Sequence, residues 1–351
     1  MTRLEERYRR VLRLLPAWYR EVWEEDMVAT YLASVDTSDP DDADYAADYG
    51  RPSWSEVASV VALAVQLRVG SAGAAPRSTL WGHAIRLAAL SAMLWHAASS
   101  AVGLLTGLWL AGVIPFLPPP PMPDEYRLLL YGQPWETFRI VGGLLWLPAY
   151  LLLVFGLWTA ARWLTSIAVV ATTVYMVWIE RWPGDVFTVS SSYDRLLAIL
   201  LVAAMFVVFH RDAPPIPRRP WLLALPYATA VVIGYVILLQ AAGSSLPPLD
   251  WDGVLSVVMV AAAVVYLSAR RLGRSSDTWA PALAILAVAV LGMRAASLLD
   301  FALFRSFGWP SATVPLGIAE AIALSVVAVM LILLTSASMR RLPSTPGVRS
   351  W

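Results

Sequence analysis

Residues 81–113, WGHAIRLAALSAMLWHAASSAVGLLTGLWLAGV, decide the fold class, because they separate a charged N-terminal part of the chain from an almost wholly apolar remainder. The stretch is long enough to cross a bilayer as a tilted helix. Its last charged residue is Arg86, near its start. Small residues recur every four positions between Ser99 and Ala111, and such stripes let neighbouring membrane helices approach closely. We therefore predict a central, packed membrane helix, with His96 facing protein beside the stripe.

The composition places the whole chain among polytopic membrane proteins. Of 351 residues, 58% are apolar and only 15% are charged, with a mean hydropathy of +0.62. The absence of cysteine excludes disulfides, thiolate metal sites and cysteine nucleophiles. Residues 1–79 carry nine Arg against thirteen acids, so this acidic front part is not expected to bind nucleic acid.

Hydrophobic periodicity predicts a small cytoplasmic helical domain over residues 1–70. Three amphipathic helices are expected, at about 2–15, 17–33 and 54–69. In the second helix the inward side is expected to carry Tyr19, Val22, Trp23, Met27 and Tyr31. The first two helices have net charges of +3 and −3, which favours an antiparallel hairpin. The alternative is that the Arg-rich first helix lies on anionic lipid.

The remaining boundaries of the front part follow from local composition. The segment S-W-S-E from Ser53 to Glu56 is a capping box that opens the third helix. The acidic linker at 35–52 lacks the glycine and the terminal glutamate of a calcium loop, so no metal site is expected. Residues 71–80 are rich in small residues and predict a flexible tether.

The run LEERYRRVLRLLPAWYREVWEEDMVATYL (residues 4–32), followed by YGRPSWSEVASVVALAVQLRVG (49–70), resembles a known kind of domain. It is similar to the helical prefix domains that precede the membrane spans of bacterial permease-like and signalling proteins, including HAAS-type domains associated with PadR-type regulators. The Arg-rich, lysine-free style resembles uncharacterised actinobacterial membrane proteins. The front domain is tethered, amphipathic and has helices of complementary charge, and these features predict that it engages a protein partner. The candidate contact residues are Tyr8, Arg9, Arg13, Trp18, Trp23 and Glu24.

Eight apolar runs predict a transmembrane domain of about eight helices over residues 81–339, followed by a cytoplasmic tail at 340–351. The runs are 81–113, 140–160, 163–180, 194–210, 221–241, 253–269, 279–303 and 313–338. A tight turn around Arg162 is expected between the second and third runs. With the front domain inside, inner segments hold ten Arg and outer loops hold five. This bias predicts a multi-pass plasma-membrane protein with both termini cytoplasmic.

Ionisable residues inside the spans are the candidate functional residues, because they are costly to bury. Arg294 and Glu320 lie at similar depths on the last two spans and are expected to meet, with Asp300 nearer the outer surface as a third member. The pair is either part of a polar pocket or proton-sensitive switch, or a structural ion pair that holds a helical hairpin. His96 in the first span is either a packing histidine or a proton carrier.

No catalytic motif or phosphate-binding loop is present, and no pair of histidines has metal-ligand spacing, so we expect neither an enzyme nor a cofactor. The leading hypothesis is a non-enzymatic signalling or regulatory membrane protein that contacts lipid and a cytoplasmic protein partner. The alternative is a transporter or permease subunit that uses the polar residues of the last two spans. A homo-oligomer is left open.

Overall fold

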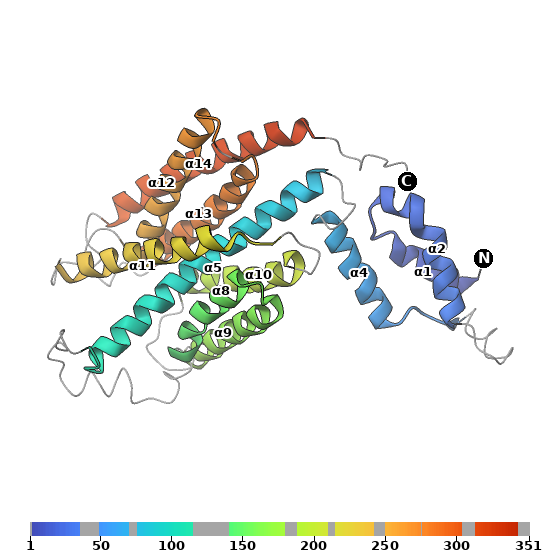
Figure 1. Ribbon diagram of the computed structural model, residues 1–351, viewed down its shortest axis with the longest axis horizontal. Coiled ribbons are helices and arrows are strands. Elements are labelled where there is room, and N and C mark those ends of the chain that lie inside the picture. Colours follow the sequence, from blue (N-terminus) through green and yellow to red (C-terminus); the bar gives the residue numbers. More distant parts are fainter. Residues whose placement is uncertain are drawn as a thin grey trace. The chain divides into compact units, whose positions relative to one another are not determined.

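The computed structural model shows an all-α protein (Figure 1). It describes residues 2–35, 49–69, 76–114, 140–179, 188–209, 215–241, 250–274, 276–303 and 313–342, which form 11 helices. Most of the predicted acidic linker, residues 71–75 of the predicted tether and the end of the predicted tail lie outside these ranges. Residues 76–80, predicted as part of the flexible tether, instead form the start of the helix Pro76–Leu110. The chain divides into an N-terminal unit, residues 1–83 with 339–351, and a membrane unit, residues 84–338.

The N-terminal unit holds three amphipathic helices, α1 (Arg3–Leu12), α2 (Ala17–Val35) and α4 (Trp54–Arg68). They enclose one apolar core whose buried members are Leu4, Tyr8, Leu12, Leu15, Val28, Tyr31, Val60, Ala64 and Leu67. The capping box at the start of α4 is confirmed, because Ser53 and Glu56 each accept a hydrogen bond from the other's backbone N–H. The unit therefore has its own core, built from local helical periodicity.

The inward side predicted for α2 is partly wrong. Val22 and Trp23 are exposed, at 66% and 48%, while Val28 is buried beside Tyr31. The core of this unit is small, so one narrow stripe of α2 is enough to close it, and a second apolar stripe is left facing outward.

The remaining helices belong to the membrane unit, although the ends of the first and last extend beyond its boundary. They are α5 (Pro76–Leu110), α8 (Trp146–Val154), α9 (Trp158–Ile179), α10 (Val189–Val208), α11 (Arg218–Ala241), α12 (Trp251–Arg271), α13 (Trp279–Leu303) and α14 (Thr313–Arg340). By length and composition, five of the described helices can cross a membrane: α5, α10, α12, α13 and α14. The protein is therefore a multi-pass membrane protein. The outward faces of α10 and α14 expose Leu196, Ile199, Leu200, Ile322, Val326, Val329 and Leu333, as lipid contact requires.

A count of eight spans is not shown. Helix α8 and the helical residues before it form one apolar stretch, Ile140–Val154, which is about 22 Å long at 1.5 Å per residue, against a hydrocarbon core of about 30 Å. Helices α9 and α11 have 22 and 24 residues but are not among the five described helices that are apolar enough to span. Each has polar residues or prolines within its first turns, for example Arg162 in α9 and Arg219 in α11.

The turn expected around Arg162 lies earlier in the chain. Helix α8 ends at Val154 and α9 begins at Trp158, and Gly156 between them has φ +87°, a backbone conformation that favours glycine. Arg162 lies inside α9, with its guanidinium 5.5 Å from the ring centre of Phe206 on α10. The prediction failed because Arg162 was taken as the break between two apolar runs, whereas the glycine makes the turn.

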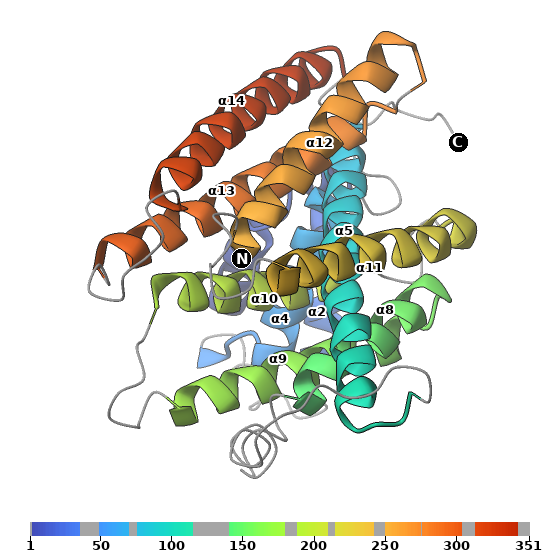
Figure 2. The ribbon, with the colours of Figure 1, turned by 90° about the vertical axis from the view of Figure 1, so that its left-hand side faces the viewer.

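The small-residue stripe of α5 does not pack as predicted. A Cβ added at Gly103 or Gly107 would meet nothing within 4 Å in the described part of the chain. Helix α5 instead buries Ala98 and Val102 against Val232 of α11, the helix that crosses α5 in Figure 2. Stripe periodicity shows which residues share a face, but the partner helix decides which face is used.

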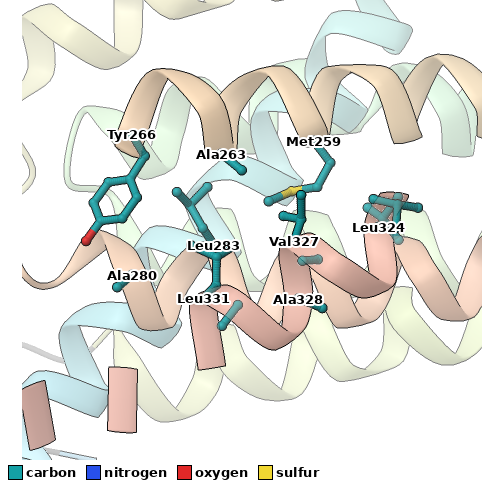
Figure 3. Close-up of a cluster of buried hydrophobic side chains, with 12 residues drawn as sticks. Met259, Ala263, Tyr266, Ala280, Leu283, Leu324, Val327, Ala328 and Leu331 are labelled. Carbon is teal, nitrogen blue, oxygen red and sulfur yellow. The ribbon is translucent and has the colours of Figure 1, made fainter. Parts of the chain in front are cut away.

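Helices α12, α13 and α14 form the apolar core of the membrane unit (Figure 3). Met259, Ala263 and Tyr266 of α12 face Leu283 of α13 and Val327 of α14. Ala280, Ala284 and Ala287 lie on one side of α13 and let the neighbouring backbones approach. This packing fixes the three helices that carry the charged residues described next.

Candidate functional site

Arg294 of α13 is the centre of the candidate site, which we call the Arg294 cluster and define as Asp250, Asp252, Arg294, Ser297 and Glu320. The Arg294 side chain is fully buried. Its Nη1 lies 2.7 Å from both carboxylate oxygens of Asp250, and its Nε lies 2.9 Å from Oε2 of Glu320. An uncompensated buried charge is strongly destabilising, so these two partners hold the guanidinium in the core.

Glu320 of α14 is only 8% exposed, and its pairing with Arg294 is incomplete. The Nε–H of Arg294 does not point along the 2.9 Å contact, and neither carboxylate oxygen of Glu320 accepts a hydrogen bond within the described residues. The Nη2 atom of Arg294 also has no hydrogen-bond partner there. The cluster thus contains buried polar atoms that lie in ion-pair contact but are not fully satisfied by hydrogen bonds within the described residues.

Gly317 of α14 makes room for the guanidinium. A Cβ at this position would overlap Nη2 of Arg294 and lie 3.0 Å from its Cζ. Among residues with a side chain, even alanine would push the guanidinium aside, so the contact of the Arg294 side chain with α14 depends on glycine here.

Asp250 and Asp252 come from the start of α12, directly before the apolar run predicted at 253–269. Asp250 is the N-cap residue of α12, and its Oδ1 accepts a hydrogen bond from Gly253 N at 2.8 Å. Asp252 lies in the first helical turn and is hydrogen-bonded to Ser297 Oγ of α13. The signal in the sequence was the D-x-D spacing directly before an apolar run, which puts two carboxylates at a helix N-terminus where they are favoured.

Asp300 does not join the Arg294 cluster as predicted. Its carboxylate accepts hydrogen bonds from the backbone N–H groups of Val189, at 2.7 Å, and Ser190, at 3.0 Å. These are the first residues of α10, so a buried aspartate of α13 caps a neighbouring helix. The prediction was wrong because nothing in the local sequence shows that α10 begins beside α13.

His96 faces protein, as expected, but lies on α5 and is not part of the Arg294 cluster. Its imidazole stacks on the ring of Trp146 of α8, with centroids 4.2 Å apart and planes at 17°.

The six candidate contact residues of the N-terminal unit have different environments. Tyr8 is buried and stacks on Tyr31, with centroids 4.0 Å apart, and burial together with the charge of Glu56 raises the pKa of its phenol. It therefore belongs to the core. Arg13 and Trp23 are exposed, and Trp18 is partly buried.

Arg9 and Glu24 are engaged within the unit. The two terminal nitrogens of Arg9 each lie 2.7 Å from an oxygen of Glu25, and Nη1 lies 3.5 Å from Glu24. The hydrogen bonds from Arg9 lower the pKa of the Glu25 carboxyl below its ordinary value. These contacts join α1 to α2, as expected for a hairpin with opposite net charges.

Comparison of the chain with protein families, with characterised proteins and with solved structures gave no match. The resemblance of residues 4–32 to prefix domains therefore stays a prediction. The fold and the charged residues define the class, a multi-pass helical membrane protein. Within the described residues, no group of three or more His, Cys, Asp or Glu side chains is arranged to hold a metal ion.

Proposed function

We propose that the protein is a non-enzymatic membrane regulator whose N-terminal unit binds a cytoplasmic protein partner, with both termini in the cytoplasm. The observation that carries this proposal is the outward stripe of α2. Val22 and Trp23 remain exposed although the unit has a complete core of its own. An exposed apolar stripe beside polar residues is typical of an interaction surface.

The charges around this stripe favour a basic partner. Glu21 and Asp26 are exposed on the same helix and close in sequence to Val22 and Trp23. A partner with apolar contact residues and surrounding Arg or Lys would bury the tryptophan and match the acidic rim. The inside orientation rests on the excess of Arg in the predicted inner segments.

A crosslinked pull-down from native membranes tests the proposal, with full-length chains that carry Val22→Ser and Trp23→Ser together. The matched control is Val61→Ser, which also removes an exposed apolar side chain, at 41% exposure, but from α4. We expect the double variant to lose a specific soluble partner that the wild type and the control retain. Retention of that partner by the double variant, or no partner for the wild type, would contradict the proposal.

The second candidate function is a transporter or permease subunit, and the incompletely satisfied Arg294 cluster favours it. Buried ionisable groups between membrane helices often mark substrate or ion pathways. Since the sequence has no phosphate-binding loop, an energy-coupled form would need a separate ATPase. Recovery of an ATPase in the same pull-down would favour this candidate over a regulator.

A further inference from the structure

The Arg294 cluster contains more acidic groups than basic ones. Asp250 and Glu320 both lie within ion-pair distance of Arg294, and Asp252 is hydrogen-bonded to Ser297 of the same helix. Asp194 of α10 and Tyr235 of α11 are further titratable groups of the neighbouring helices. The cluster, as defined above, thus has one guanidinium to balance the charge of three carboxyl groups.

The guanidinium is already committed to two of these carboxylates. The Nη1 atom of Arg294 lies 2.7 Å from Oδ2 of Asp250, and its Nε atom lies 2.9 Å from Oε2 of Glu320. Glu320 is more than nine-tenths buried and accepts no hydrogen bond in the described chain, so it is poorly stabilised even as the partner of Arg294. A third ionised carboxylate at Asp252 would add negative charge that the cluster does not balance.

Hydrogen counting at Ser297 indicates how the imbalance is relieved. The Oγ atom of Ser297 is in hydrogen-bond contact with Oδ2 of Asp252 and lies 3.0 Å from the carbonyl oxygen of Met293. A hydroxyl has one hydrogen to donate, and a carbonyl oxygen only accepts. Both contacts are hydrogen bonds if Ser297 donates to Met293, as helical serines commonly do, and receives a hydrogen from Asp252.

We propose that Asp252 is a proton-binding site of the membrane unit. In the occupied state the neutral carboxyl donates to Ser297 Oγ, and Ser297 donates to the carbonyl oxygen of Met293. The cluster then has one guanidinium and two carboxylates. In the empty state Asp252 is ionised, and the hydrogen of Ser297 turns from Met293 to the carboxylate.

This inference goes beyond either proposed function, since a regulator and a transporter can each use a proton in the membrane. Asp252 follows Trp251 in the sequence. The centre of the Trp251 ring lies 5.1 Å from that of Trp95 of α5 and 5.3 Å from that of Tyr235 of α11. A change in the charge of Asp252 therefore occurs at the junction of α5, α11, α12 and α13.

Infrared difference spectroscopy between two pH values, on the full-length chain in detergent micelles free of ester lipids, tests the site, because protonation converts a carboxylate into a carboxyl whose C=O stretching band lies above the amide bands. We expect the wild type at neutral pH to show such a band, and Asp252→Asn to lose it. The control Asp277→Asn removes an exposed carboxyl, with 69% of its side chain accessible, and should keep the band. Ser297→Ala removes the hydrogen-bond acceptor and should shift the band without abolishing it.

Two results would overturn the proposal. If the spectra of the wild type and Asp252→Asn are the same in the carboxylic-acid region at neutral and acidic pH, Asp252 does not bind the proton. If the wild-type band is lost in Glu320→Gln and kept in Asp252→Asn, the proton resides on Glu320. Size-exclusion chromatography and circular dichroism of each variant establish that the loss of a band is not a loss of the fold.

Discussion

The two units of this protein each hold an arginine that is paired with acidic side chains, and the environments of the two arginines differ sharply. Arg9 pairs with Glu25 and Glu24 at the surface of the N-terminal unit, where 80% of the Glu25 side chain is accessible. Arg294 pairs with Asp250 and Glu320 in the membrane unit, with none of its own side chain accessible. The same residue types at similar distances therefore contribute differently to stability. Water screens the ion pairs of Arg9, whereas those of Arg294 are shielded from it.

The difference also concerns what would replace a lost partner. If Glu25 is removed, Arg9 keeps Glu5 at 3.0 Å and gains water. If Arg294 is removed, Asp250 and Glu320 lose their counter-ion in a core built of apolar helices. The Arg9–Glu25 pair therefore adds little to the stability of the α1–α2 hairpin. The packing of α12, α13 and α14, in contrast, requires Arg294 to stay paired with Asp250 and Glu320.

The largest expected effect comes from Arg294→Leu. The substitution leaves acidic groups buried without a cation, and breaking a buried pair in this way destabilises by about 3–5 kcal/mol. We expect this loss in the unfolding free energy measured by denaturant titration in detergent micelles.

The double variant Arg294→Leu with Glu320→Leu sharpens this test. It removes one of the stranded carboxyl groups and should recover part of the loss, which a double-mutant cycle would report as a coupling between the two positions. Equal stability of Arg294→Leu and the wild type would show that the buried set carries no more weight than the surface pair. Recovery of function together with folding would identify the pair as structural.

A smaller effect is expected for Gly317→Ala. The new methyl group must displace the guanidinium, and overpacking of this kind costs about 1–3 kcal/mol. Gly103→Ala on α5 is the matched control, because its Cβ would meet nothing within 4 Å among the described residues. Thermal unfolding should distinguish the two. A loss at Gly103 as large as that at Gly317 would mean that helix backbone effects, and not contact with Arg294, explain the result.

The smallest effect is expected for Glu25→Gln in the surface pair. Because Arg9 lowers the pKa of Glu25 in the folded chain, the pair stabilises the N-terminal unit above the ordinary pKa of a glutamate. This contribution is lost as the pH falls through the lowered pKa. Chemical-shift titration of Glu25 in the full-length chain measures that pKa directly, and the stability difference between wild type and Glu25→Gln should shrink in acid. A difference that grew on acidification would reverse the sign of this argument.

Several features of the fold were predictable because they depend on residues close together in the chain. The helical class, the membrane location and the capping box at Ser53 all follow from composition and short-range periodicity. The contact between Arg294 and Glu320 could also be anticipated, since the two residues lie at similar distances from one connecting loop.

The features that sequence reasoning missed all depend on which elements become neighbours. The stripe of α5 at Gly103 and Gly107 lacks a partner in the described chain, and the outward side of α2 holds Trp23, because a regular pattern does not say which face a neighbour covers. The turn at Gly156 was missed for a different reason. This glycine adopts a positive φ angle, but it lies inside a continuous apolar run and so gives no separate turn signal in the sequence.

The sequence by itself determined that this is an all-α membrane protein with a charged helical front part, because helix formation and membrane insertion respond to the residues of each segment separately. Only the tertiary structure decided how its buried charges are used. Asp300 caps the N-terminus of α10. Asp250 pairs with Arg294, and Asp252 is hydrogen-bonded to Ser297. The physical reason is that a buried charge must find its partner across helices, and that choice depends on packing between segments far apart in the chain.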